Sequence, residues 1–210
     1  KNRDLLAQLD AKEKALSAEQ DRLNKLSSEL ASNTKRLNEL ESMIAAKDAA
    51  MKKLKDTLSK ALNAFEGKGL TVQMKNGKVY VSMENKLLFQ TGSWSVGSEG
   101  RIAVVEVGKV LAQNPDITVL IEGHTDTDPY IGNDNLSGNW DLSTKRATEI
   151  VKLLLKNKTI KPENLTAAGR GEHFPLASNK AAAGKAKNRR IEVILSPKLD
   201  KIAELLERVD

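Results

Sequence analysis

A long segment without glycine or proline most constrains the fold of this chain. Residues 1–64 contain neither residue type and are rich in Ala, Leu, Lys, Glu and Gln, which favour helices. Apolar residues recur in this segment every seven positions: Leu9, Leu16, Leu23, Leu30, Leu37, Ile44, Met51 and Leu58. A seven-residue period sustained this long is typical of a left-handed coiled coil. At about 1.5 Å per residue, a continuous helix of roughly 64 residues would extend about 95 Å.

The second seam position of this repeat is apolar only about half of the time, because Lys12, Glu19, Asn33 and Lys47 interrupt its leucines. Polar seam residues weaken association, but they can fix the register and the number of helices. We therefore expect a self-associating stalk, with a parallel dimer favoured. The alternatives are a solvated single helix and a helical hairpin, although no turn residues interrupt the run.

Composition restricts the class to which the chain can belong. It has 210 residues, enough for one domain and an appendage, with a net charge of +6 and no cysteine. A disulfide framework, a thiol nucleophile and Cys-ligated zinc are therefore excluded. Positive and negative residues are interspersed, so nucleic acid is not expected as a partner. No apolar run approaches the roughly 18 residues of a membrane span, and we expect any targeting or anchoring segment to lie upstream of Lys1.

Glycines in the segment 66–69 end the helical pattern, which predicts a stalk at 1–66 and a globular domain at 67–197. An amphipathic helix is expected at 198–210. Two alternating segments flank Asn76-Gly77 and predict a β-hairpin.

Strands and helices then alternate along the predicted domain. Further strands are expected at 117–121, 164–168 and 191–195, with a short one at 86–89. A helix capped by Ser98 is expected to bury Ile102, Val105, Val110 and Leu111; a second helix covers 143–157, and 173–187 is a surface loop. This order predicts an α+β fold, an α/β sandwich in which helices pack on a mixed sheet.

The segment 121–147, which joins a strand to a helix, is unusually polar. It gathers Asp126, Asp128, Asn133, Asp134, Asn135 and Asn139 before closing with Lys145-Arg146. A loop this polar cannot hold a core together, so its side chains are free to face a ligand.

Motifs of the common enzyme classes are missing from the sequence. It has no G-x-S-x-G elbow, and Gly169-Arg-Gly171 falls short of a phosphate-binding loop. The pattern His124-x-Asp126-x-Asp128 has only His173 as a further imidazole. We therefore expect a protein that is not an enzyme and that carries no metal or cofactor, with His124 as a structural histidine.

Asp126 and Arg146 can face each other across one loop, because one follows a strand and the other lies at the start of a helix. A carboxylate binds an ammonium group and a guanidinium binds a carboxylate bidentately, so the pair suits a zwitterion. A plain salt bridge between Asp126 and Arg146 that closes the loop fits the spacing equally well.

Four motifs occur in an order that resembles the peptidoglycan-binding domain of the OmpA family. They are Gly123-His-Thr-Asp126, Asn139-Trp-Asp-Leu-Ser-Thr-Lys-Arg146-Ala147, Gly169-Arg-Gly171-Glu and Asn188-Arg-Arg190-Ile-Glu-Val, within a resemblance that covers about residues 70–195. It implies that Asp126 and Arg146 hold the two ends of diaminopimelate in the stem peptide, with Asn139 as a further binding residue. It also implies supporting positions at Phe89, Thr91, Gly92, Ser93, Thr125, Leu142, Arg189 and Arg190, one of the two arginines having a structural salt bridge as its alternative.

The loop from Asp126 to Asn139 is longer than in many outer-membrane members, and with residues 138–143 it resembles the MotB branch, the flagellar stator subunit. The resemblance predicts a non-catalytic cell-wall anchor in the periplasm of a Gram-negative bacterium, attached to the outer membrane. An inner-membrane, MotB-like motor subunit is the alternative. A third class, an enzyme that trims peptidoglycan, would need a catalytic group that the sequence does not show.

Overall fold

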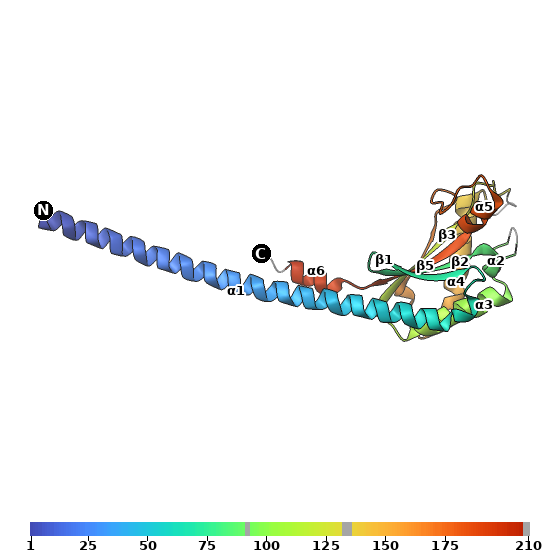
Figure 1. The fold of residues 1–210 in the computed structure, drawn as a ribbon, viewed down its shortest axis with the longest axis horizontal. Helices are drawn as coiled ribbons and strands as arrows, with labels where there is room; N and C mark the ends of the chain where they lie inside the picture. The colour runs from blue at the N-terminus through green and yellow to red at the C-terminus, as the bar shows by residue number, and fades with distance from the viewer. Residues whose placement is uncertain (91–92, 132–135, 208–210) are drawn as a thin grey trace. The chain divides into compact units, whose positions relative to one another are not determined.

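The computed structural model describes residues 1–90, 93–131 and 136–207 (Figure 1). The chain divides into two compact units, one formed by residues 1–46 and 199–210 and the other by residues 47–198. Helix α1 (Asn2–Ala61) contributes to both units. Within the described ranges, no helix is both long enough and apolar enough to cross a bilayer.

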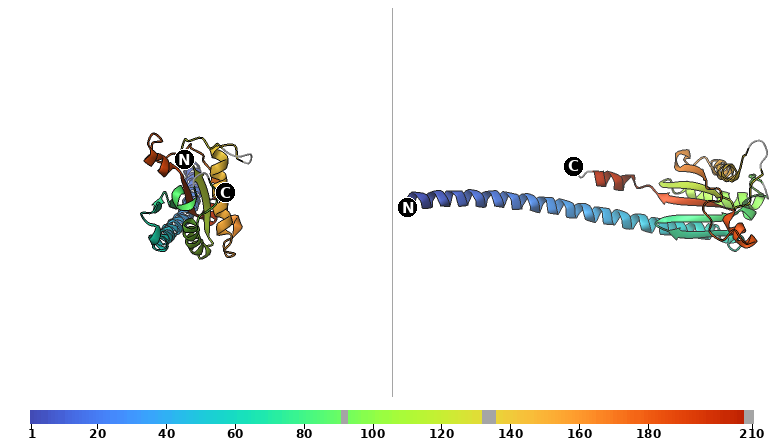
Figure 2. Two further views of the ribbon diagram at one scale, coloured as in Figure 1. Left: turned by 90° about the vertical axis from the view of Figure 1, so that its right-hand side faces the viewer. Right: turned by 90° about the horizontal axis from the view of Figure 1, so that it is seen from above.

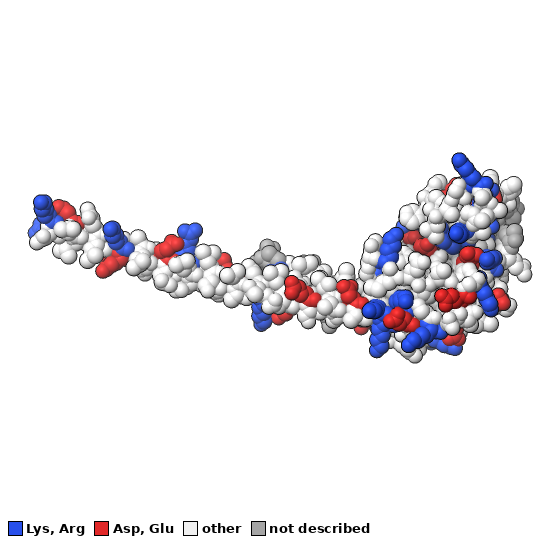
Figure 3. All heavy atoms as spheres, viewed as in Figure 1, with Lys and Arg blue, Asp and Glu red and all other residues white. Residues whose placement is uncertain are grey.

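The first unit contains the predicted helical segment and helix α6 (Asp200–Glu207). Lysines, arginines and acidic residues are interspersed along α1 (Figure 3). The repeating leucines at 9, 16, 23, 30 and 37 are between 53% and 73% exposed. The helix that the sequence predicts is therefore present, and its seven-residue stripe from Leu9 to Leu37 faces solvent in the single chain.

The second unit is built on a five-stranded mixed sheet with the order β1-β2-β5-β3-β4, whose strands lie side by side (Figure 2). The strands are β1 (Leu70–Lys75), β2 (Lys78–Glu84), β3 (Ile117–His124), β4 (Leu165–Gly169) and β5 (Arg190–Pro197). Only β3 and β4 pair in parallel. The predicted hairpin is confirmed: Asn76 and Gly77 both have positive φ, at 52° and 69°, as a tight two-residue turn requires.

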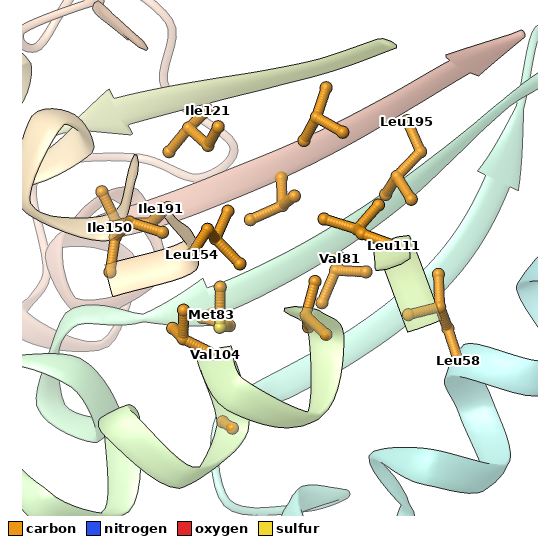
Figure 4. Close-up of a cluster of buried hydrophobic side chains, with 14 of the residues drawn as sticks. Leu58, Val81, Met83, Val104, Leu111, Ile121, Ile150, Leu154, Ile191 and Leu195 are labelled. Carbon is orange, nitrogen blue, oxygen red and sulfur yellow. The ribbon is translucent and has the colours of Figure 1, made fainter. Parts of the chain in front are cut away.

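One face of the sheet carries the core. Val81, Val193 and Ile121 lie directly opposite one another on neighbouring strands, and all three are buried. Side chains from α3 (Ser98–Ala112), α4 (Asn139–Leu154) and the last turns of α1 complete this cluster (Figure 4). The α1 contribution consists of Met51, Leu54 and Leu58. The compact unit therefore begins inside α1, at Lys47, and not where the helical pattern ends.

Several local expectations are wrong. Residues predicted as a short strand at 86–89 form most of helix α2 (Asn85–Leu88), which buries Leu87 and Leu88 together. Ser98 is the first residue of α3, and its cap is Gly97, which makes no side-chain cap hydrogen bond. Part of the loop expected at 173–187 is helix α5 (Ala182–Asn188), favoured by its alanines and lysines.

The buried face of α3 also differs from the predicted stripe. Ile102 is 55% exposed and Val105 is 42% exposed, whereas Ala103, Val104 and Val107 are buried. Contact with α4 selects this face, which periodicity alone did not identify.

Candidate functional site

A cavity of about 370 Å³ opens where strand β3 ends. Its wall combines the start of α2, the segment that follows β3, the first half of α4 and the residue before β5. The lining residues are Asn85, Thr125, Asp126, Asp128, Pro129, Tyr130, Asn139, Leu142, Arg146 and Arg189. Six of the residues singled out in the sequence are thus brought together: Thr125, Asp126, Asn139, Leu142, Arg146 and Arg189.

The sheet and helix α4 position these residues. Strands β3 and β5 are antiparallel neighbours, so the end of β3 lies beside the start of β5. Helix α4 approaches β3 and β4 closely, and two glycines on these strands make room for it. A Cβ on Gly123 would lie only 2.0 Å from the carbonyl oxygen of Ser143, and one on Gly169 would lie 2.2 Å from Thr144 Oγ1. This close approach sets Arg146 beside the segment that carries Asp126.

Asp126 is held in place by three contacts at the cavity wall. Its Oδ2 accepts an ion-paired hydrogen bond from Arg189 Nη1, and its Oδ1 accepts one from the backbone N–H of Asp128 at 3.2 Å. Asn139 Nδ2 donates to the carbonyl oxygens of Asp126 at 3.3 Å and Asp128 at 3.1 Å. Asn139 therefore fixes the loop backbone on which the carboxylate stands.

Arg146 is a buried cation, only 4% exposed. Its Nε donates to the carbonyl oxygen of Ser93 at 3.0 Å, and the guanidinium carbon lies 5.3 Å from the centroid of the Phe89 ring. Burial lowers the pKa of Arg146 to about 10, so the group stays positive at neutral pH. Among the described residues, no carboxylate forms an ion pair with it. A buried cation without an anionic partner is costly and attracts an anion.

The salt bridge between Asp126 and Arg146, which the spacing left open, does not form in the described part of the chain. Asp126 pairs with Arg189 instead, a residue 63 positions away along the sequence. Both predicted residues thus line the same cavity. Among the described residues no carboxylate forms an ion pair with Arg146, although the nearby charge of Asp126 acts against the effect of burial on its pKa.

The other predicted binding residues differ in where they lie relative to the cavity. Phe89 and Ser93 contact Arg146 without lining the cavity. Arg190 is 2% exposed and points elsewhere, since its Nε donates to Glu192 Oε1 at 2.7 Å; it is the structural member of the arginine pair. Thr91, Gly92, Asn133, Asp134 and Asn135 lie outside the described residues.

Four lining residues were not among the predicted binding residues: Asn85, Asp128, Pro129 and Tyr130. Burial lowers the pKa of Arg146, and Tyr130 acts in the opposite direction. Tyr130 and Asp128 lie in the polar loop, which was a usable signal, whereas nothing in the sequence near Asn85 points to the cavity.

The opposite face of the sheet holds a buried polar cluster behind the cavity. Glu122 and Glu192 are cross-strand partners, and each carboxylate gives one oxygen to an arginine, Arg170 at 2.8 Å and Arg190 at 2.7 Å. Nε2 of His124 lies 3.7 Å from Glu122 Oε2 and 3.9 Å from Glu192 Oε2. Since each acidic charge already has a cationic partner, the cluster balances its charge without a metal ion.

The imidazole of His124 should make stability depend on pH. Burial, together with the charges of Arg190 and Arg170, lowers the pKa of His124 to about 3. The unfolded chain binds this proton near pH 6.5 and the folded chain does not, so stability is complete above that pH and falls below it. Lowering the pH from about 7.5 to about 5 should reduce the free energy of unfolding by about 2 kcal/mol. Urea unfolding at both pH values measures this loss, which His124→Asn should largely remove; an equal loss in the variant would refute the assignment.

Comparison with known proteins adds family evidence. Residues 88–189 match the OmpA family. Motility protein B of Bacillus subtilis (strain 168) is 34% identical over 129 residues, which cover 61% of this chain and 49% of the relative. The chain therefore spans about half the length of that relative.

Two solved structures share the fold. The cell wall anchor of the T6SS from Pseudomonas aeruginosa matches with a TM-score of 0.61 and 30% identity, over 67% of this chain and 97% of that chain. The periplasmic domain of Helicobacter pylori MotB (residues 90–256) matches with a TM-score of 0.59 and 22% identity, over 69% of this chain and 91% of that chain.

Proposed function

Because the chain belongs to the OmpA family, we propose that its globular unit binds peptidoglycan non-covalently and anchors a cell-envelope protein to the wall. The ligand is diaminopimelate of the stem peptide, bound in the cavity at the end of β3. Asp126 receives the ammonium group, Arg146 binds the carboxylate, and Asn139 holds the loop between them. No bond is made or broken, so the protein acts as an anchor and not as an enzyme.

The observation that carries this proposal is that the buried guanidinium of Arg146 forms no ion pair with a carboxylate of the described residues. A guanidinium that is 4% exposed and lacks a carboxylate partner among the described residues needs an anion to complete it. A ligand carboxylate can accept two parallel hydrogen bonds from such a group. The carboxylate of Asp126 adds a charge of the opposite sign to the same cavity. A ligand with only an anionic group would make no ion pair with it, whereas a ligand that also carries an ammonium group would.

Arg189 gives the buried carboxylate of Asp126 a cationic partner within the protein. Its side chain is 39% exposed, whereas that of Asp126 is 5% exposed. The arginine can therefore turn toward water when a ligand ammonium takes its place, and the buried carboxylate never loses a cationic partner.

Displacement by small molecules tests the ligand class. The chain should co-sediment with peptidoglycan sacculi, and free diaminopimelate should release it. 1,5-Diaminopentane is the matched control, because it keeps both ammonium groups of diaminopimelate and has no carboxylate for Arg146 to bind. Equal release by 1,5-diaminopentane, or no release by diaminopimelate at high concentration, would contradict the assignment.

A second candidate is a MotB-like stator subunit of an ion-driven motor, whose periplasmic domain anchors to the wall in the same way. The similarity to motility protein B of Bacillus subtilis favours it. The two candidates differ upstream of Lys1, where a motor subunit needs an inner-membrane helix with an acidic residue and an outer-membrane anchor needs a lipoprotein cysteine. Sequencing that region decides between them, and a lipoprotein cysteine there would exclude the motor.

The exposed leucines of α1 support pairing with a second copy of the chain, and we expect a parallel dimer. Analytical ultracentrifugation should give a mass about twice 23.0 kDa. Placing a charge on the stripe with Leu23→Asp and Leu30→Asp should yield monomers, because both leucines would leave water in the dimer. Ser28→Asp, which lies off the stripe, is the control. A monomeric parent chain would refute the coiled coil.

A further inference from the structure

An exposed aromatic shelf lies at the start of α4, where Trp140 directly follows the cavity residue Asn139. Trp140 and His173 stack with ring centroids 5.3 Å apart and an interplanar angle of 29°. Trp140 is 54% exposed, and the side chain of His173 is 57% exposed. Aromatic residues make up only 3% of the chain, so placing a tryptophan on the surface is notable. The fold does not need this contact for its core, since neither residue belongs to the buried cluster.

The shelf and the cavity share one hydrogen-bonded frame. Ser143 Oγ donates to the carbonyl oxygen of Trp140 at 2.9 Å and accepts from the N–H of Gly171 at 3.1 Å. The carbonyl oxygen of Gly171 accepts from the N–H of Thr125 at 2.9 Å. Thr125 lines the cavity, as does Asn139, which directly precedes Trp140. The shelf is therefore joined by hydrogen bonds to residues that line the cavity.

We propose that the shelf formed by Trp140 and His173 stacks on a sugar ring of the glycan strand when the stem peptide occupies the cavity. This inference rests on the proposed function. A pyranose ring presents C–H groups on its face and hydroxyl groups on its rim. The face of an aromatic ring is the negative side of its quadrupole and attracts C–H groups.

The surroundings of the shelf fit the polar rim of a sugar. Glu172, whose Oε1 lies 3.9 Å from His173 Nε2, flanks the aromatic pair. The glycan is also the polymer to which every stem peptide is joined, so a peptide in the cavity brings a sugar near this surface. A protein partner would need a larger apolar area than two side chains provide.

Calorimetry with two ligands tests the shelf. One ligand is the stem tripeptide that ends in diaminopimelate, and the other is the same tripeptide attached to its disaccharide. The chain should bind the disaccharide-peptide about fivefold to tenfold more tightly. Trp140→Ala should remove this preference and leave the affinity for the free peptide unchanged, whereas Trp140→Phe should retain most of it. Ile102→Ala, which removes a side chain 55% exposed on α3, is the control and should change neither affinity.

The possible failures are distinguishable. Equal affinity of the parent chain for both ligands would overturn the shelf and leave the peptide site standing. A Trp140→Ala variant that loses affinity for both ligands equally would assign Trp140 to the support of the cavity, and it would also overturn the shelf. Binding of neither ligand by the parent chain would overturn the proposed function itself.

Discussion

Replacing Arg146 with alanine is expected to abolish co-sedimentation of the chain with peptidoglycan sacculi. The substitution removes the buried guanidinium and leaves the ligand carboxylate without its partner. Removing one member of a buried, hydrogen-bonded charge pair typically costs about 2–5 kcal/mol, which lowers affinity by at least about 30-fold. Asp126→Ala should have an effect of the same size, because the ligand ammonium then loses its carboxylate.

Loss of binding must be separated from loss of fold. Arg146 forms no ion pair with a carboxylate of the described residues, so Arg146→Ala should lose only its hydrogen bond to Ser93 and its contact with Phe89 and should leave the protein folded. Arg146→Lys retains the charge and loses the bidentate geometry, and it should bind only weakly. Arg101→Ala, an exposed arginine on α3, is the matched control and should bind as the parent does. Undiminished binding by Arg146→Ala and Asp126→Ala would contradict the assignment of these two residues to the ligand site.

Replacing Gly123 with alanine is expected to cause a large loss of stability. The new Cβ would lie 2.0 Å from the carbonyl oxygen of Ser143 and 2.8 Å from its carbonyl carbon, both of which belong to the backbone of α4. A flexible side chain cannot relieve this clash, so the helix must move away from β3. Overpacking of this kind costs about 3 kcal/mol or more. Urea unfolding measures the change.

Gly108→Ala is the control for this substitution. It lies in the middle of α3, and a Cβ there would meet only Leu154 Cδ2 at 3.5 Å and Ile160 Cδ1 at 3.6 Å, which are ordinary contacts. Alanine also favours a helix over glycine by about 1 kcal/mol, so Gly108→Ala should be neutral or stabilising. If both variants unfolded at the same urea concentration as the parent, the close approach of α4 to β3 would not be a constraint.

Features encoded by neighbouring residues could be predicted from the sequence. The long helix follows from a run of helix formers, and the hairpin follows from Asn76-Gly77, whose two positive φ angles suit the turn. Helix α4 begins at Asn139, earlier than the predicted residue 143, because polar residues before the apolar stripe give no periodic signal.

Features that depend on distant contacts could not be predicted in this way. Met51 and Leu58 continue the seven-residue period of the stalk, yet they pack in the core of the globular unit. Periodicity records only that a position is apolar, and it does not say which surface will cover it. The ion pair of Asp126 with Arg189 likewise joins residues far apart in the sequence, which spacing within one loop cannot reveal.

The ion pair between Arg189 and Asp126 has a consequence for how tightly one domain can hold the wall. At the proposed site, ligand capture would exchange the ion pair of Asp126 with Arg189 for one with the ligand ammonium. This exchange offsets part of the attraction at Asp126, so each domain should release its stem peptide readily. A polymer that displays many stem peptides compensates through avidity. In the dimer proposed above, binding of one domain would give the second domain a high effective concentration of ligand, and the pair would stay attached while each contact is renewed. Such an anchor would stay attached to the wall while single contacts are released and re-formed, so its position could change as the wall grows.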